Sequence, residues 1–260
     1  DVIVGANNYS NGQFNEGAAF VYHGSPTGIN TSATVMVESN WVGAGMGNSV
    51  AAAGDVNGDG YSDVIIGAYD YDNGQGGEGA IYVFHGSPTG INIIPAAIVE
   101  SNQALAGLGW SVASAGDVNA DGFSDVIVGA YNYSQGQLYE GAAFVYHGSS
   151  TGINPSYAAM VQSNILSAWM GFSVSTAGDI NGDGYSDVIV GLHYYDNPES
   201  WEGAAFIYHG SPTGINTSPA AQVESNQSVA FLGCSVYTAG DVNGDGYSDV
   251  IVGADYYDNG

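Results

Sequence analysis

The 260-residue chain contains no lysine and no arginine, although it carries 26 acidic residues and a formal net charge of −26. Binding to nucleic acid requires cationic side chains that displace the counterions of the phosphate backbone, so a nucleic-acid partner is excluded. The same absence excludes attraction to anionic lipid headgroups. It also excludes enzymes that depend on a phosphate clamp, a Schiff-base lysine or an arginine finger.

Cysteine and long apolar runs are also scarce. The single cysteine, Cys234, cannot form a disulfide within the chain, so cysteine usage does not fix the redox compartment. No stretch approaches the roughly 20 apolar residues that a spanning helix needs, so no membrane insertion is expected. The chain begins at Asp1 without an initiator methionine or a signal peptide, which indicates a processed protein or a piece of a longer one.

The acidic composition does not indicate disorder. Disordered chains are poor in apolar residues, whereas this chain is 45% hydrophobic and contains 19 tyrosines. A net charge this large repels itself unless cations neutralise it. The composition therefore favours a folded protein that holds bound cations.

A nine-residue string recurs at a fixed interval. It begins at Asp55 and returns at Asp117, Asp179 and Asp241, each 62 residues after the last. His-Gly-Ser and Glu-Gly-Ala triplets keep the same step, and four histidines in identical positions favour a packing role over catalysis. The register never slips, so every copy is expected to occupy the same structural position.

Each period contains four short apolar segments bounded by glycine and turn residues, as in residues 63–67, 80–84, 97–100 and 110–114. Four strands in about 60 residues are typical of a propeller blade. The sequence thus predicts an all-β fold of tandem four-stranded β-propeller-type blades with a 62-residue repeat. A β-solenoid is the alternative. Complete blades are expected at 43–104, 105–166 and 167–228, with partial blades at 1–42 and 229–260, as in a window of a longer array.

The recurring string has the composition of a metal loop. Asp55, Asn57 and Asp59 occupy alternate positions, so their oxygen atoms can surround a common centre when the loop curls. A glycine at the sixth position permits the sharp turn, Tyr61 can offer its backbone carbonyl, and Asp63 would complete the shell. Hard oxygen ligands without histidine or cysteine favour calcium over zinc or copper.

Four such loops predict four calcium ions. The other ligand sets are Asp117, Asn119, Asp121, the Phe123 carbonyl and Asp125; Asp179, Asn181, Asp183, the Tyr185 carbonyl and Asp187; and Asp241, Asn243, Asp245, the Tyr247 carbonyl and Asp249. Magnesium and metal-free turns capped by Asp and Asn are the alternatives. Extracellular sites of this class bind calcium at about 10⁻⁴–10⁻³ M, which predicts an extracellular or cell-surface setting.

These residues resemble the FG-GAP repeats of integrin α-subunit propellers and their bacterial relatives. Leu108-Gly109 stands for the family's Phe-Gly, the aspartate loop follows, and Gly129-Ala130-Tyr131 stands for its Gly-Ala-Pro. The resemblance covers the whole chain. It implies calcium-braced blades with ligand binding or adhesion on the loop face.

The predicted function is that of a calcium-stabilised extracellular repeat protein, a structural or adhesive component of a surface or filament. No catalytic site is expected, because no repeat carries a polar constellation of its own. The alternative is a calcium-dependent, lectin-like propeller, since Tyr9, Tyr71, Tyr133, Tyr195 and Tyr257 recur beside polar turn residues. The expected partner is a protein or glycan at the cell surface, with end-to-end self-association as a further hypothesis.

Overall fold

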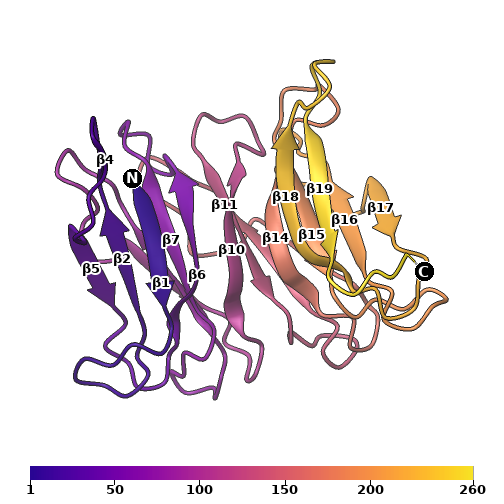
Figure 1. Cartoon of the computed structure of the whole chain (residues 1–260), viewed down its shortest axis with the longest axis horizontal. Coiled ribbons are helices and arrows are strands. Elements are labelled where there is room, and N and C mark those ends of the chain that lie inside the picture. The colour runs from indigo at the N-terminus through magenta and orange to yellow at the C-terminus, as the bar shows by residue number, and fades with distance from the viewer. Residues whose placement is uncertain (260) are drawn as a thin grey trace.

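The computed structural model describes residues 1–259, which form 19 β-strands and no helix. No part of this described chain therefore offers a helix that could cross a membrane. The strands form antiparallel sheets that follow one another along the chain (Figure 1).

Three of the sheets have four strands each, hydrogen bonded in sequence order. Their strands are β6 (Met46–Gly54), β7 (Asp63–Ala68), β8 (Ala80–Phe84) and β9 (Ala97–Glu100); β10 (Leu108–Gly116), β11 (Asp125–Ala130), β12 (Ala142–Tyr146) and β13 (Ala159–Gln162); and β14 (Met170–Gly178), β15 (Asp187–Leu192), β16 (Ala204–Tyr208) and β17 (Ala221–Glu224). The predicted fold of four-stranded blades is confirmed. The solenoid alternative is wrong, because these strands pair within one repeat rather than between repeats.

The outermost sheets have fewer strands. The first contains β1 (Val2–Ala6), β2 (Ala18–Tyr22) and β5 (Val35–Glu38), with a small hairpin of β3 (Gly24–Ser25) and β4 (Gly28–Ile29) beside it. The last contains β18 (Leu232–Gly240) and β19 (Asp249–Ala254).

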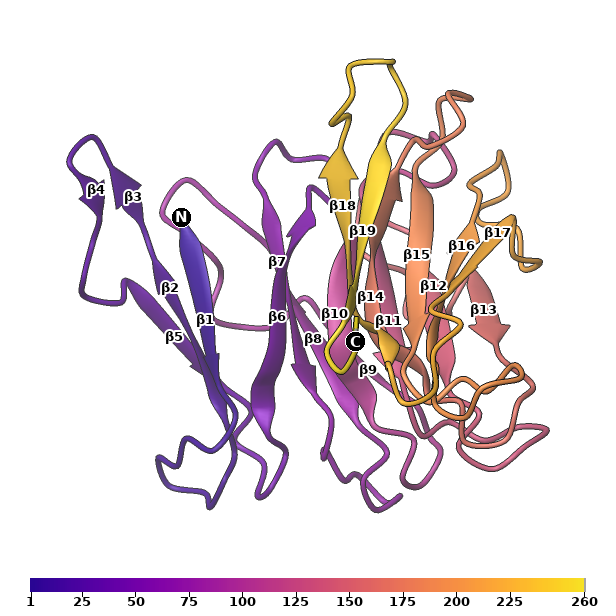
Figure 2. The same ribbon diagram turned by 45° about the vertical axis from the view of Figure 1, so that its right-hand side comes forward.

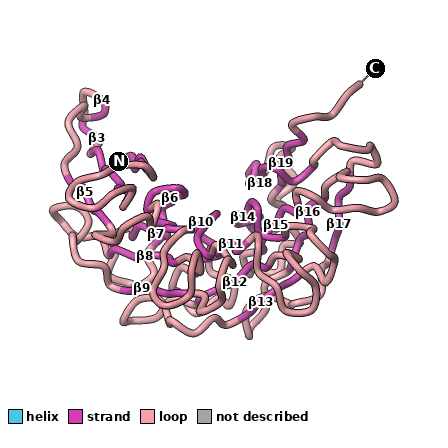
Figure 3. The backbone as a smooth tube through the Cα atoms, turned by 90° about the horizontal axis from the view of Figure 1, so that it is seen from below, coloured by secondary structure: helices cyan, strands magenta, loops and turns pink. Residues whose placement is uncertain are grey.

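The sheets are arranged as an open arc. Figure 3 shows β6, β10, β14 and β18 on the inner side of the arc, with β9, β13 and β17 on the outer side. Strands β1 and β19, the first and the last along the chain, lie toward opposite ends of the arc (Figure 3). The turned view in Figure 2 shows the sheets standing beside one another, each rotated relative to its neighbour.

The core lies between adjacent sheets. Ile65, Ile81 and Val83 of one blade pack with Val126 and Val128 of the next in a single buried cluster. Because an internal sheet is covered on both faces, its strands are continuous apolar runs rather than alternating ones, and all six residues of β11 are buried.

A glycine in the second strand of each internal blade sets the spacing between sheets. A Cβ atom added to Gly67 would lie 1.9 Å from the carbonyl oxygen of Gly109 in the next blade. Gly129 has the same relation to Gly171 at 1.9 Å. No other residue fits this approach of two backbones, which explains the Gly-Ala dipeptide that ends these strands.

Candidate metal centre

The first aspartate loop connects β6 to β7, and the side chains of Asp55 and Asn57 both accept a hydrogen bond from one backbone amide. The N–H of Asp59 donates to Oδ1 of Asp55 at 3.0 Å and to Oδ1 of Asn57 at 3.0 Å. The N–H of Gly60 donates to Oδ2 of Asp55 at 2.8 Å, and Asn57 Nδ2 donates to Asp59 Oδ2 at 3.0 Å. The predicted ligands at positions one, three and five therefore converge.

The other three loops repeat this arrangement. In each, the N–H of the fifth residue is shared by the side-chain oxygens of the first and third residues. The distances are 3.1 and 3.0 Å for Asp121 to Asp117 and Asn119, 3.1 and 2.9 Å for Asp183 to Asp179 and Asn181, and 3.1 and 2.9 Å for Asp245 to Asp241 and Asn243. The local sequence alone therefore fixes the loop conformation.

The closing aspartate has a different role from its neighbours. Asp63 is 0% exposed, and its Oδ2 accepts the N–H of Val56 at 2.8 Å. Its Oδ1 accepts the N–H of Gly86, from the His-Gly-Ser segment after β8, at 2.8 Å. Asp63 thus fastens the loop to a distant part of its own blade.

Burial dominates the electrostatics of these closing carboxylates. It raises the pKa of Asp63, although the two N–H donors act in the opposite direction. The same balance raises the pKa of Asp125 to about 6. A nearby positive charge would offset this cost, and the chain has no lysine or arginine to supply one.

Within residues 1–259, no group of three or more histidine, cysteine, aspartate or glutamate side chains is arranged to hold a metal ion. The reason lies in the composition of the loops. Two carboxylates and one amide converge in each, while the third carboxylate faces backbone N–H groups. The converging donors are oxygen atoms only, which is the donor type that calcium takes.

Each internal loop also docks on the following blade. The N–H of Ser124 donates to the Asp55 carbonyl at 2.9 Å, and the Asp55 N–H donates to Ser124 Oγ at 3.1 Å. The N–H of Ser149 donates to the Val56 carbonyl at 3.0 Å, while the Val56 side chain is fully buried. One aspartate loop is therefore attached to the next.

Sequence reasoning missed these serines, although a signal was present. A serine occupies the eighth position of every copy of the string, where no ligand role is assigned to it. The backbone bond recurs from Ser186 to Asp117 at 3.0 Å and from Ser248 to Asp179 at 3.0 Å.

The periodic histidines lie in the same joints. Their Nε2 atoms would lie within 2.8 Å of a Cβ added to a glycine of the following repeat, in the pairs His23 with Gly90, His85 with Gly152 and His147 with Gly214. This close contact across the joint agrees with the packing role predicted for them.

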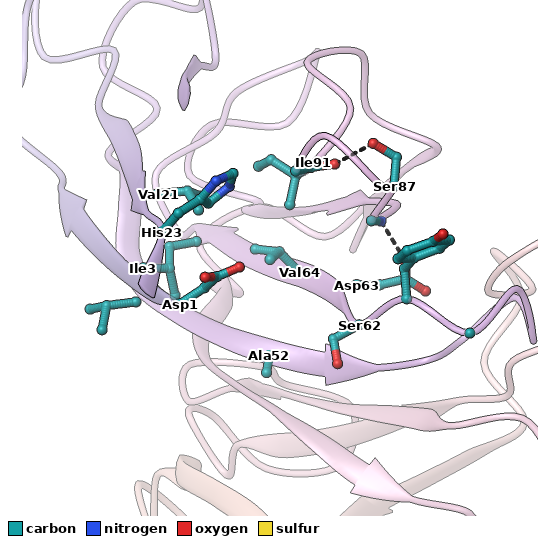
Figure 4. Close-up of a pocket in the computed structure, with 15 residues that line it drawn as sticks. Asp1, Ile3, Val21, His23, Ala52, Ser62, Asp63, Val64, Ser87 and Ile91 are labelled. Atoms are coloured by element: carbon teal, nitrogen blue, oxygen red, sulfur yellow. Dashed lines mark hydrogen bonds between the residues drawn. The ribbon is translucent and has the colours of Figure 1, made fainter. Parts of the chain in front are cut away.

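A cavity of about 460 Å³ lies between the first sheet and the next blade. Figure 4 shows Asp1 and His23 on one side of it and Ser62 and Ser87 on the other. At the following joint the corresponding serines hold the backbone of a preceding aspartate loop. The cavity therefore presents the two serines that correspond to the ones holding an aspartate loop at the following joint.

These features define a repeat protein of β-propeller-type blades with an acidic loop at each joint. The FG-GAP repeat profile matches residues 46–84 and 108–146, and the FG-GAP-like repeat profile matches residues 179–252. Together these matches cover more than half of the chain. The chain belongs to the FG-GAP repeat family.

Integrin α subunits are among the curated relatives. Integrin alpha-7 of Rattus norvegicus is 32% identical over 167 residues, which is 62% of this chain and 14% of the relative. Integrin alpha-6 of Gallus gallus is 34% identical over 161 residues, with 60% and 14% covered. This chain therefore spans only a small fraction of the relatives that it matches.

Two solved structures share the fold. Rhamnogalacturonan lyase YesW superposes with a TM-score of 0.50 at 16% identity, over 89% of this chain and 42% of the lyase. Rhamnogalacturonan lyase YesX has a TM-score of 0.50 at 13% identity, over 96% of this chain and 42% of the lyase. At this identity the likeness concerns the fold alone.

Proposed function

We propose that this chain is a calcium-stabilised extracellular repeat domain with a structural or adhesive role, which binds a protein at the cell surface. The observation that carries the proposal is the position of the acidic loops. Each loop gathers oxygen donors, and each of the first three also docks on the following blade. A cation bound there would act on the loop and on the joint together.

The proposed ligands of the first ion are Asp55, Asn57, Asp59, the Tyr61 carbonyl and Asp63, whose two oxygens each accept one backbone N–H and keep a further lone pair for the ion. Calcium would supply the positive charge that the chain lacks and would offset the repulsion among the carboxylates. The protein's own part is to present the oxygens, to fasten the loop through Asp63 and to bury Val56 against the next blade. The same ligand roles are proposed for the corresponding residues of the other three loops, while docking on a following blade is confined, within residues 1–259, to the first three.

The extracellular setting follows from the proposed affinity. Loops of this class fill at about 10⁻⁴–10⁻³ M calcium, which is the concentration range of extracellular modules. Membership of the integrin-related repeat family supports a partner that is a protein at a cell surface. The blade boundaries at 43–104, 105–166 and 167–228, and assembly of several copies into a filament, are part of the same proposal.

Calorimetric titration of the chelator-treated protein with calcium tests this function. We expect binding at about four sites and a higher melting temperature in calcium. A variant in which Asp55 and Asp59 are both replaced by Asn should lose one site, whereas Asp72→Asn, an exposed position in a hairpin loop, should lose none. Equal stoichiometry in all three proteins would contradict the proposed ligands.

A further inference from the structure

A second cavity, of about 340 Å³, lies between the first two complete blades. Its lining includes Glu100 at the end of β9, Phe144 and Tyr146 of β12, and Tyr133 and Tyr157 from loops of the same repeat. None of the lining residues belongs to an aspartate loop. Its volume falls in the range of small-molecule sites, which are typically apolar and aromatic with a few polar groups.

Aromatic rings form one wall of this cavity. Phe144 lies 5.3 Å from Tyr133 and 5.3 Å from Tyr157, both in edge-to-face geometry. Burial raises the pKa of Tyr133, and the nearby Tyr157 phenol raises it further, as it does for Tyr146. Tyr133, Tyr146 and Tyr157 all line the cavity, and Tyr157 is the most exposed of the three.

One wall residue is specific to this repeat. The position of Tyr157 is occupied by Ala33, Pro95 and Pro219 in the other repeats. Tyr157 is 52% exposed, so the fold does not need its side chain to fill a core. A large aromatic residue placed at one joint and absent from the others indicates binding rather than packing.

The polar groups define the class of ligand. Anionic ligands are disfavoured, because the chain has a net charge of −26 and no lysine or arginine. Glu100 is the one carboxylate in the lining, and it already accepts hydrogen bonds from Asn73 Nδ2 at 3.1 and 3.3 Å. These hydrogen bonds leave its negative charge in place, so an organic cation is the competing ligand that the binding experiment must exclude. The remaining groups are hydroxyls, phenols and the Asn102 amide, which exchange hydrogen bonds with other hydroxyls.

We infer that this cavity binds one uncharged sugar residue of a glycan. The exposed Tyr157 ring, with the half-buried Tyr133 beside it, covers the apolar C–H side of the sugar ring, while their phenol groups and the Asn102 amide pair with its hydroxyls. The inference deepens the proposed adhesive function by adding a glycan to its partners, and it rests on that function only for the extracellular setting. It does not require calcium in the site.

Binding is tested with the folded protein in millimolar calcium on a panel of immobilised neutral, acidic and amino-sugar oligosaccharides. Neutral oligosaccharides should bind, and free neutral hexoses should compete. Tyr157→Ala, which installs the residue of the first repeat, should weaken binding at least ~10-fold. Tyr133→Phe, which removes one hydroxyl, should weaken it by a smaller factor. Tyr139→Ala, at an exposed tyrosine outside the cavity, should leave binding and the melting temperature unchanged.

Three outcomes would overturn the inference. In the first, no neutral glycan binds. In the second, Tyr157→Ala binds glycan as well as the parent protein does. In the third, the protein selectively binds a lysine-rich peptide or tetramethylammonium. The calcium proposal fails separately, by an unchanged melting temperature in chelator. If the protein binds glycan and its melting temperature does not change in chelator, the glycan site is supported and only the calcium proposal is wrong.

Discussion

The first three aspartate loops and the fourth share nearly the same string but differ in their surroundings. Val56 and Val118, in the first two loops, are 0% exposed, whereas Val242 in the fourth is 71% exposed. The hydrogen bonds from the N–H of the fifth residue to the first and third side chains recur in all four loops. The comparison separates two properties: the loop conformation is local, whereas its burial depends on the blade that follows.

The closing aspartates show the same contrast. Asp63, Asp125 and Asp187 are fully buried and accept an N–H from the segment that follows the third strand. Asp249 keeps the local bond from the Val242 N–H at 3.0 Å, and it is only half-buried. A docked loop is therefore part of the core between blades, while the fourth loop resembles a surface turn.

Removal of calcium is expected to lower the melting temperature more than any substitution described below. If calcium is present at 100 times its Kd, each filled loop contributes about 2.7 kcal/mol of stability. For a chain of this size that corresponds to roughly 5–10 °C per loop. Differential scanning calorimetry in 10 mM calcium and in excess chelator measures the change, with a magnesium arm to identify the ion. Identical melting curves would show that the loops are metal-free turns.

A charge at the buried valine should have the next largest effect. Val118→Asp places an unpaired carboxylate in a fully buried position and is expected to cost about 3–5 kcal/mol of unfolding free energy. Val242→Asp makes the same change in the fourth loop, where an exposed substitution should stay within about 0.5 kcal/mol. Urea unfolding in saturating calcium compares the two. Equal losses would mean that docking does not distinguish the loops.

Much of this fold could be predicted from the sequence because its signals are local and repeated. The predicted segments 63–67, 80–84 and 97–100 match β7, β8 and β9, since turn residues bound each apolar run. The convergence of Asp55, Asn57 and Asp59 was also predictable, because alternate positions of a tight loop face one centre.

The remaining features depend on residues far apart in the chain. The bond from Gly86 to Asp63 spans 23 residues and joins the start of β7 to the segment after β8, so spacing within the loop could not reveal it. The serine contacts cross from one blade to the next over 69 residues. The cavity beside Tyr157 depends on how two blades meet, because residues 99–102 come from one blade and Tyr157 from the next.

Replacing the glycine near the end of β11 with alanine tests how closely two blades must approach each other. In Gly129→Ala the new Cβ would lie 1.9 Å from the backbone oxygen of Gly171, so the two blades must separate, at an expected cost of about 1–3 kcal/mol. In Gly253→Ala the nearest atom is the Ser235 hydroxyl at 2.4 Å, which can rotate away. Thermal melts of both variants should show the larger loss for Gly129→Ala, and the reverse order would contradict the docked arrangement.

The smallest expected effect concerns the joint that holds β18 and β19 on the third blade. His193 lies between two aromatic rings there, 4.4 Å from Phe172 and 4.8 Å from Phe231, in stacked geometry. Burial lowers the pKa of His193, although Asp255 acts in the opposite direction. Below the ordinary histidine pKa the unfolded chain therefore binds more protons than the folded chain, and stability falls as the pH falls.

His193→Phe removes this titration and keeps the stacking. The variant should lose less stability than the parent between pH 7 and pH 5.5, by a small difference that melting in the same two buffers measures. The other four histidines are common to both proteins and cancel in the comparison. If both proteins respond equally to pH, His193 remains accessible to protons in the fold. The last hairpin would then be attached less tightly than the internal blades are to one another.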